Sequence, residues 1–225
     1  MFYSAVLLDL DGTLVDSYLD ADQCWSDWAL SVGVGESFDL AHHYGRKRAD
    51  IVRALLPHLT EHEIAEHAER VRIEERGYTG QTVALPGARE LLESLGPDQW
   101  AIVTSNDAEV AVARLRAAEL PLPRVLVSAD DVRLPKPAPE GFLLAARRLG
   151  HAPAETVAVD DSPIGIEAAN AAGCTSIGIR FRHDDASLSA ARAVYDNVGA
   201  IPFELVEDGA LVRLMEVARD GQHLA

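Results

Sequence analysis

Residues 5–16 read AVLLDLDGTLVD, an apolar run that ends in two aspartates and a glycine. Such a short run, bounded by polar residues, is typical of a buried strand in a parallel sheet. Four similar runs follow, and a helical pattern separates each run from the next. The strands are expected at residues 5–10, 100–104, 124–127, 156–160 and 175–179, and the helices at 87–95, 107–118, 139–149 and 163–172. This alternation predicts an α/β fold with a doubly wound parallel sheet, which binds ligands beyond the carboxyl ends of its strands.

About 70 residues interrupt the alternation between the first two strands. They show no strand pattern, and helices are expected at residues 20–31, 49–56 and 60–75, the last supported by a capping-box sequence at its start. A βα connection usually takes a handful of residues, so the segment predicts an inserted helical cap subdomain. We expect a core domain of residues 1–15 and 86–225 and a cap of residues 16–85. A last helix is expected at about residues 202–219.

Asp9 and Asp11 end the first strand two residues apart, so alternation sends both side chains to one side of its tip. Gly12 then allows the backbone to turn. The pair suits a divided task, in which one carboxylate attacks phosphorus and the other exchanges a proton with the leaving oxygen. The competing interpretation is that the two aspartates only end a strand and cap a turn.

A second acidic pair, Asp160 and Asp161, ends the fourth strand before a proline that suits the first position of a helix. Asp161 or Ser162 as the cap of that helix would account for one acid, but not for two acids near Asp9. Two unit charges ~4 Å apart repel by about 4 kcal/mol at an effective dielectric constant of ~20. A hard divalent cation removes this conflict, and oxygen ligands near a phosphate favour Mg²⁺.

Two further segments offer groups for a phosphate. Thr104, Ser105 and Asn106 follow the second strand and precede a helix, a position that suits a phosphate oxygen and equally suits routine helix capping. Lys136, one of only two lysines in the chain, lies between two prolines. The prolines restrict the backbone, which favours a fixed charge that neutralises phosphate over an exposed lysine in an ordinary turn.

Composition limits the class of partner. The formal net charge of −16 argues against nucleic acid or an anionic membrane surface, and no apolar run approaches the ~18 residues of a membrane span. The two cysteines match no metal or redox spacing, and the apolar start lacks a basic leader, so we expect a cytoplasmic monomer with reduced thiols. The one compact basic cluster, residues 44–48 in the cap, is either a contact for substrate or a solvated helix face.

Four motifs in order resemble the haloacid dehalogenase (HAD) superfamily over nearly the whole chain. They are Asp9-Leu10-Asp11-Gly12-Thr13, Thr104-Ser105-Asn106, Lys136-Pro137-Ala138-Pro139 and the stretch DDSPIGIEAA at residues 160–169. The first and fourth are highly specific, whereas the second means little outside this order. A helical cap after the first motif resembles the subgroup of β-phosphoglucomutases and sugar phosphatases. Haloacid dehalogenases themselves lack the second aspartate, so Asp11 favours phosphoryl transfer.

The resemblance implies roles for the acidic residues. Asp9 would be the nucleophile and a ligand of Mg²⁺. Asp11 would be the general acid and base, and its backbone carbonyl would also touch the metal. Asp160 and Asp161 would form the metal-binding acid pair, although glutamate is more usual at the first of these positions.

The resemblance also implies how substrate is held. Thr104 would bind phosphate, with Ser105 and Asn106 beside it, and Lys136 would be the catalytic lysine of the third motif. The cap also contains a segment that resembles the substrate-recognition loop of the subgroup, with residues Gly45, Arg46 and Arg48.

The function expected from these motifs is a Mg²⁺-dependent phosphatase that hydrolyses a small sugar or polyol phosphate through an aspartyl-phosphate. The stretch at residues 85–105, which is similar to bacterial sugar and polyol phosphatases, favours this reading. The nearest alternative is a mutase like β-phosphoglucomutase, which would share every core residue. A non-enzymatic alternative is a signalling domain phosphorylated on aspartate, but receiver domains are shorter and have no such insertion.

Overall fold

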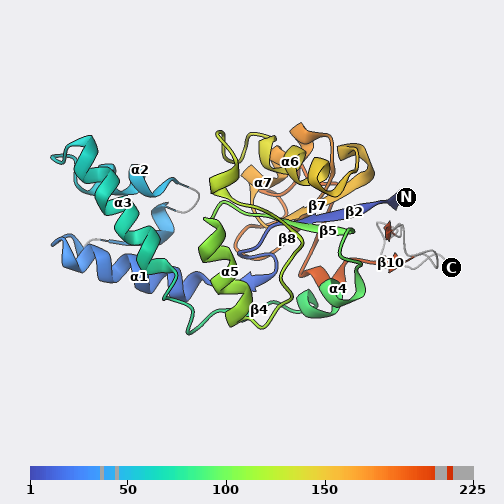
Figure 1. The fold of residues 1–225 in the computed structure, drawn as a ribbon, viewed down its shortest axis with the longest axis horizontal. Coiled ribbons are helices and arrows are strands. Elements are labelled where there is room, and N and C mark those ends of the chain that lie inside the picture. Colours follow the sequence, from blue (N-terminus) through green and yellow to red (C-terminus); the bar gives the residue numbers. More distant parts are fainter. Residues whose placement is uncertain (36–37, 44–45, 206–211, 215–225) are drawn as a thin grey trace. The chain divides into compact units, whose positions relative to one another are not determined.

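The computed structural model describes residues 1–35, 38–43, 46–205 and 212–214. The chain divides into two compact units, Met1–Asp16 with Ala84–Ala225 and Ser17–Val83 (Figure 1). These limits lie within two residues of the expected domain boundaries. That the second unit acts as a cap stays a prediction. Among the described residues, no helix combines the length and the apolar character needed to cross a bilayer.

The first unit is built on a six-stranded sheet in which all neighbouring strands run parallel. Its strand order is β6-β5-β2-β7-β8-β9. The strands are β2 (Ala5–Leu8), β5 (Trp100–Val103), β6 (Val125–Val127), β7 (Thr156–Asp160), β8 (Thr175–Ile179) and β9 (Ala193–Tyr195). The chain starts at the centre of the sheet, builds one side and then crosses to the other, so the predicted doubly wound α/β fold is confirmed. Each of the five expected strands is present, and β9 is an additional edge strand.

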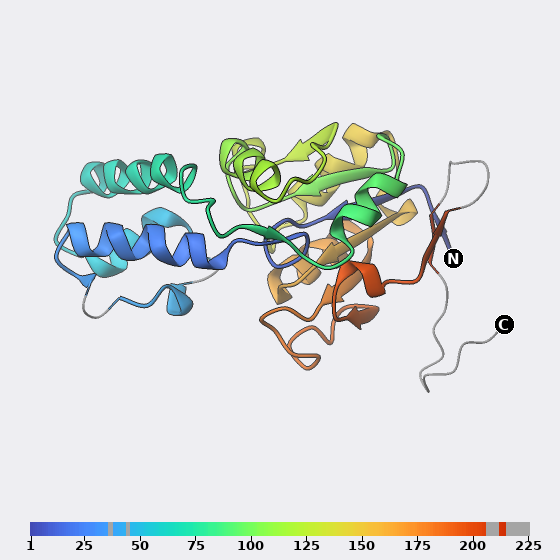
Figure 2. The same ribbon diagram turned by 90° about the horizontal axis from the view of Figure 1, so that it is seen from below.

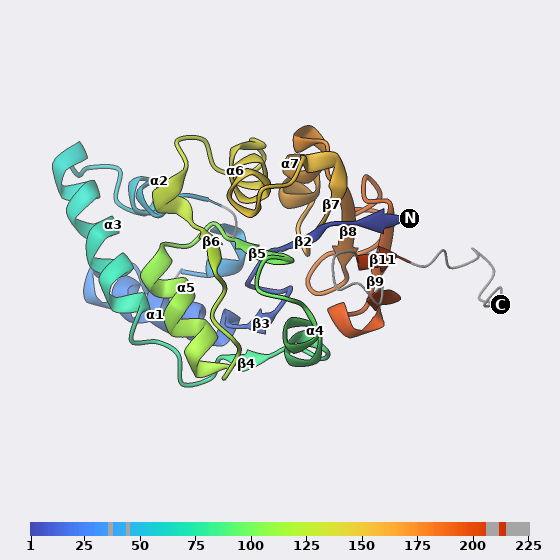
Figure 3. The same cartoon turned by 45° about the vertical axis from the view of Figure 1, so that its right-hand side comes forward.

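Helices cover both faces of this sheet (Figure 3). They are α4 (Ala88–Ser94), α5 (Ala108–Ala117), α6 (Glu140–Leu149) and α7 (Pro163–Ala172), each within one residue of its expected ends. Alternate residues of a strand face opposite sides. Thus Leu8 of β2 shares one apolar core with α4 and α5, whereas Leu7 shares the other with α6 and α7. Burial on both faces explains why the strands read as continuous apolar runs.

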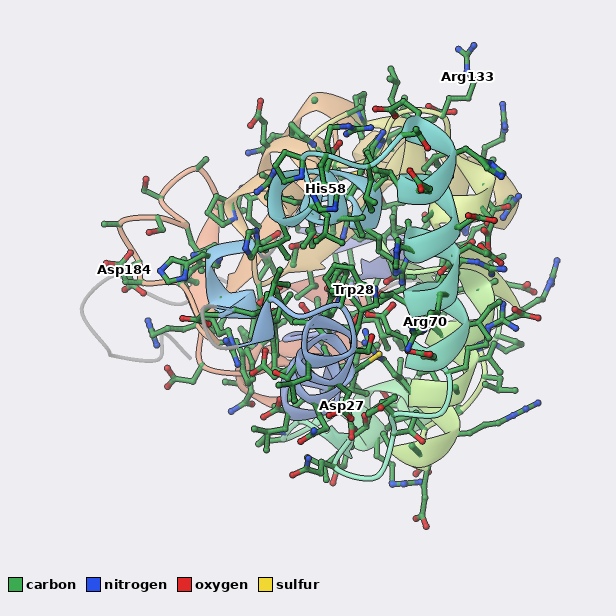
Figure 4. The ribbon with its side chains drawn as sticks, turned by 90° about the vertical axis from the view of Figure 1, so that its left-hand side faces the viewer. Asp27, Trp28, His58, Arg70, Arg133 and Asp184 are labelled. Atoms are coloured by element: carbon green, nitrogen blue, oxygen red, sulfur yellow. The ribbon has the colours of Figure 1, made fainter. Side chains whose placement is uncertain are left out.

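The second unit is helical, as expected. It contains α1 (Tyr18–Ser31), α2 (Arg48–Leu55) and α3 (Glu61–Glu75). Trp28 of α1, labelled in Figure 4, is fully buried. It packs edge-on against His67 of α3, and its indole Nε1 donates a hydrogen bond of 3.3 Å to His67 Nδ1. The chain leaves and returns to the core through β3 (Val15–Asp16) and β4 (Val83–Ala84), which pair as a two-stranded sheet.

The prediction of a helix at residues 202–219 is wrong. The described part of this segment forms β10 (Phe203–Leu205) and β11 (Val212–Leu214), which pair with each other and with β1 (Phe2–Tyr3) in an antiparallel sheet (Figure 2). The sequence holds an Asp-Gly pair at residues 208–209, a strong turn signal between two strands. Pairing with the chain's amino-terminal strand is a long-range interaction that local helical periodicity does not report.

The predicted capping box at the start of α3 is confirmed. The hydroxyl Oγ1 of Thr60 accepts a hydrogen bond of 3.3 Å from the Glu63 backbone N–H, and the Glu63 carboxylate accepts one of 2.8 Å from the Thr60 N–H.

Replacing Thr60 with alanine should therefore lower the free energy of unfolding by about 1 kcal/mol, because one amide of the first turn loses its partner. Urea unfolding measures this change. An unaltered midpoint would show that the box adds nothing to stability.

Candidate active site

The two acidic pairs meet at the carboxyl ends of neighbouring central strands. Leu8 of β2 is in register with Val159 of β7, and the backbone N–H of Asp9 donates to the Val159 carbonyl at 2.9 Å. One carboxylate oxygen from each of Asp9, Asp160 and Asp161 lies within 4.8 Å of the others. All three residues are buried. Parallel pairing thus brings Asp9 to Asp160 and Asp161, which lie 151 and 152 positions further along the sequence.

Lys136 joins this acidic cluster from the loop before α6. Its Nζ donates to Asp9 Oδ1 at 2.6 Å, to Asp160 Oδ2 at 2.7 Å and to the Val103 carbonyl at 3.0 Å. Burial by itself lowers the pKa of a lysine, but the carboxylates of Asp160 and Asp9 outweigh it and hold the pKa of Lys136 above its usual value. The ammonium group is therefore a fixed positive charge between two carboxylates, with all three of its donors in use.

Asp160 has a second set of partners. Its Oδ1 accepts hydrogen bonds from the Ser162 backbone N–H at 3.0 Å and from the Ser162 hydroxyl at 2.7 Å. Ser162, one of the two candidate caps, is the cap of α7, because its hydroxyl accepts from the Gly165 N–H at 3.1 Å. The cap thus also fixes the rotamer of the acidic side chain beside it.

Two glycines let the backbone approach these carboxylates. Gly12 adopts a φ of +83°, and a Cβ there would lie 2.2 Å from Asp161 Oδ2. A Cβ on Gly165 would lie 1.9 Å from the Asp160 carboxyl carbon. Both separations are far below van der Waals contact. A side chain at either position would displace an acid of the cluster, so the glycines of the first and fourth motifs shape the site.

Asp11 lies beside this cluster and is held by two donors. Arg114 Nη1 donates to Asp11 Oδ1 at 2.8 Å, and Asn106 Nδ2 donates to Asp11 Oδ2. The Asn106 backbone N–H donates in turn to the buried hydroxyl of Thr104 at 3.1 Å. The second motif is thereby linked to the first. Ser105, its middle residue, is exposed.

Arg114 was missed by sequence analysis, although a signal for it exists. It occupies a position on α5 whose helical neighbours at 110, 111 and 115 are fully buried. An arginine at a core position of an otherwise apolar helix face needs a buried partner. This pattern predicts that Arg114 has a buried acidic partner, but it does not identify which acid that is.

The formal charges of the site do not balance. Among the described residues, the ion pairs of the four acids Asp9, Asp11, Asp160 and Asp161 are with Lys136 and Arg114, and four carboxylates against these two cations leave a formal excess of two negative charges. Within the described residues, no cation or hydrogen-bond donor pairs with the Asp161 carboxylate. Burial, reinforced by the neighbouring acids, raises the pKa of Asp161 well above its usual value. Burial likewise raises the pKa of Asp9 to about 8, against the lowering effect of Lys136. A cluster of oxygen ligands with this excess fits one divalent cation.

A family model of haloacid dehalogenase-like hydrolases matches residues 3–173. The chain belongs to this family. Hexitol phosphatase A of Escherichia coli is 40% identical over 185 residues, which cover 81% of this chain and 86% of that protein. The 2-deoxyglucose-6-phosphate phosphatase 1 of Saccharomyces cerevisiae is 29% identical over 208 residues, covering 84% and 85%.

Solved structures show the same fold. The β-phosphoglucomutase of Clostridium difficile superposes with a TM-score of 0.76 at 23% identity, over 92% of this chain and 97% of that one. The predicted HAD-type core is thus confirmed. The predicted enzyme class, a phosphoric monoester hydrolase, is also confirmed, and the non-enzymatic alternative falls away.

The expected recognition residues of this hydrolase lie in its helical unit. Gly45 lies outside the described residues. Arg46 is exposed and donates to the Asp50 carbonyl at 3.2 Å. Arg48 donates from Nε to Glu75 at 2.8 Å, and the Glu75 side chain is only 6% exposed. This contact ties α2 to α3 inside the unit, so Arg48 has a structural partner there. A role in substrate recognition stays a prediction for these residues.

Proposed function

We propose that this hydrolase is a Mg²⁺-dependent phosphatase that hydrolyses a small sugar or polyol phosphate through an aspartyl-phosphate on Asp9. The observation that carries the proposal is the geometry of the strand tip. Asp9 is held by Lys136 at 2.6 Å in a buried acidic cluster, and Asp11, two residues on, has both carboxylate oxygens held by donors. The arrangement suits a fixed nucleophile with a separate proton carrier beside it.

The first half of the reaction transfers the phosphoryl group to the enzyme. The Asp9 carboxylate attacks phosphorus, a P–O bond to Asp9 forms, and the bond from phosphorus to the substrate oxygen breaks. Asp11 gives that oxygen its proton, so the product leaves as a neutral alcohol. Lys136 offsets negative charge on the phosphoryl oxygens and on Asp160. The Thr104 hydroxyl is a further donor for a phosphoryl oxygen, with Ser105 at the same strand tip.

The second half regenerates Asp9. A water attacks the phosphorus of the aspartyl-phosphate and gives a proton to Asp11 as the bond from phosphorus to Asp9 breaks. Inorganic phosphate leaves, and Asp11 is again ready to donate. One group thus acts first as acid and then as base, which requires a carboxylate fixed beside the nucleophile.

The side chains of Asp9, Asp160 and Asp161 would hold Mg²⁺, together with the backbone carbonyl of Asp11. When bound, the ion would supply positive charge against the excess of negative charge in the site and against the phosphate oxygens. The carboxylate donor set fits a hard cation that prefers oxygen. Aspartate at position 160 is one methylene shorter than the usual glutamate, and its Oδ2 already accepts from Lys136. With this shorter reach, Asp160 would suit a contact with the ion through water.

The substrate class rests on the relatives. Hexitol phosphatase A and 2-deoxyglucose-6-phosphate phosphatase 1 are named for sugar and polyol phosphates, and both align over more than four fifths of this chain. A small phosphorylated metabolite is therefore the partner we propose. The expectations of a cytoplasmic monomer that binds neither nucleic acid nor membrane stay predictions.

Release of inorganic phosphate from a panel of sugar, polyol, nucleotide and glycolate phosphates tests the proposal. With Mg²⁺, we expect turnover concentrated on a few sugar or polyol phosphates. With EDTA in place of Mg²⁺, the rate of phosphate release should fall by at least about a hundredfold, because no cation then neutralises the excess negative charge of the acidic cluster. Added Mg²⁺ should restore it.

Two results of the same panel would overturn the proposal. Undiminished turnover in EDTA would contradict the metal requirement. Accumulation of an isomer of a sugar 1-phosphate without free phosphate would identify a mutase instead.

A further inference from the structure

We propose that Arg114 is a positioning residue that, together with Asn106, holds the Asp11 carboxylate in the orientation used for proton transfer. The inference rests on the proposed function and extends it to a residue outside all four motifs. It concerns the orientation of Asp11, the group that acts as acid and base, rather than the binding of substrate.

The two donors fix different atoms of Asp11 from different parts of the core. Arg114 Nη1, on α5, holds Oδ1 at 2.8 Å, and Asn106 Nδ2, in the loop after β5, holds Oδ2. With both oxygens bound, the plane of the carboxylate cannot rotate without breaking a hydrogen bond. A carboxylate oxygen has two lone pairs, so one hydrogen bond to it does not prevent it from exchanging a proton. The two donors thus orient Asp11 and are compatible with proton transfer.

The place of Arg114 in the fold argues that its charge serves Asp11. Its side chain is only 5% exposed, and Val110, Ala111 and Leu115 beside it on α5 are fully buried. Taking a guanidinium group out of water is costly, and an apolar side chain of similar volume would pack on this face without that cost. The ion pair with Asp11 at 2.8 Å offsets part of that cost. Lys136 contacts Asp9 and Asp160, whereas Asp11 is the acid of the site that Arg114 contacts.

Orientation of a reacting group is worth a large factor in rate, since a small misplacement slows proton transfer. The leaving group decides whether that factor is felt. An alkoxide must be protonated as it departs, whereas p-nitrophenolate departs without a proton. Loss of Arg114 should therefore slow the first half of the reaction on alkyl phosphates and spare it on p-nitrophenyl phosphate. A defect in folding or metal binding would slow both alike.

The test uses rapid mixing with enzyme in excess, so that release of alcohol or p-nitrophenol reports only the first half. The substrates are the alkyl phosphate hydrolysed fastest by the wild type and p-nitrophenyl phosphate. For Arg114→Ala we expect alcohol release about 10- to 100-fold slower, a part of the 10²–10⁴ that acid–base catalysis contributes, and p-nitrophenol release within about threefold of wild type. Ethylguanidinium in solution should restore part of the alcohol release.

Two further variants complete the test. Arg116→Ala is the matched control, because Arg116 lies on the same helix and is exposed, and both of its rates should equal those of the wild type. Arg114→Lys keeps the charge but not the planar fork of donors. It should fold even where the alanine variant does not, and should show the same preference for p-nitrophenyl phosphate with a smaller loss of at least about threefold on the alkyl phosphate.

Thermal unfolding of each variant accompanies the kinetics. Equal losses on both substrates, or no loss on either, in folded Arg114→Ala or Arg114→Lys would overturn the positioning role while leaving the phosphatase assignment intact. A wild-type protein that releases phosphate from neither substrate would overturn the proposed function, and this inference with it.

Discussion

Replacing Asp9 with asparagine is expected to abolish phosphate release and to leave the protein folded. The amide has the shape of the carboxylate but is not a nucleophile, so no aspartyl-phosphate can form. Residual activity should stay below about one per cent of wild type on the best substrate. Asp98→Asn is a matched control, since the Asp98 side chain is 61% exposed on the surface of the core unit. An Asp9→Asn variant that kept more than a few per cent of activity would contradict the assignment of the nucleophile.

The same substitution should change how stability depends on pH in the presence of EDTA. Burial raises the pKa of Asp9 from 3.8 to about 8, so the folded state binds a proton more tightly than the unfolded state does. Stability due to this group is therefore full below the unfolded pKa and is lost as the pH rises toward 8. Asparagine has no proton to lose. The unfolding midpoint of Asp9→Asn, compared with wild type, should thus become relatively higher between pH 5 and pH 8, and a constant difference would contradict this.

Replacing Lys136 with methionine should remove both activity and much of the stability. The variant leaves Asp9, Asp160 and the Val103 carbonyl without the donor that now serves all three. Breaking a buried ion pair by removing one partner costs about 3–5 kcal/mol. Phosphate release should fall by at least about a thousandfold, because the charge beside the transferred phosphoryl group is lost as well. Circular dichroism on heating and the phosphate assay measure the two effects.

Lys47, the other lysine of the chain, supplies the control for this substitution. It is exposed in the helical unit, and Lys47→Met should leave the unfolding temperature unchanged. The double variant with Asp9→Asn should be more stable than Lys136→Met alone, since one fewer buried carboxylate then lacks a counter-charge. Lys136→Met with a tenth or more of wild-type activity would show that the lysine is dispensable.

Much of the fold follows from local features of the sequence. The strands of the core and the helices between them lie within two residues of the expected limits, because apolar periodicity and turn residues are set by near neighbours. The same holds for the Thr60 capping box. The meeting of Asp9 with Asp160 and Asp161 also follows, since parallel strands carry their carboxyl ends to one edge of the sheet.

Local features of the sequence do not predict the pairing of strands that are distant in the chain. The strand β10, where a helix was expected, depends on its partners β11 and β1, and β1 comes from the far end of the chain. The edge strand β9 likewise depends on β8, to which it pairs. Whether a segment adds to a sheet depends on an available edge rather than on its own periodicity.

The family and the doubly wound core could be predicted from the sequence, because the motifs and the periodicity that indicate them are formed by residues close together in the chain. The contacts of Lys136 with Asp9 and Asp160, and of Arg114 with Asp11, are seen only in the folded protein. Those contacts depend on how α5 is rotated against the sheet and on where the loop before α6 places its ammonium group. Such orientations are set by packing between segments that are distant in the sequence, since Lys136 lies 127 positions from Asp9 and Arg114 lies 103 positions from Asp11, and no local pattern encodes that packing.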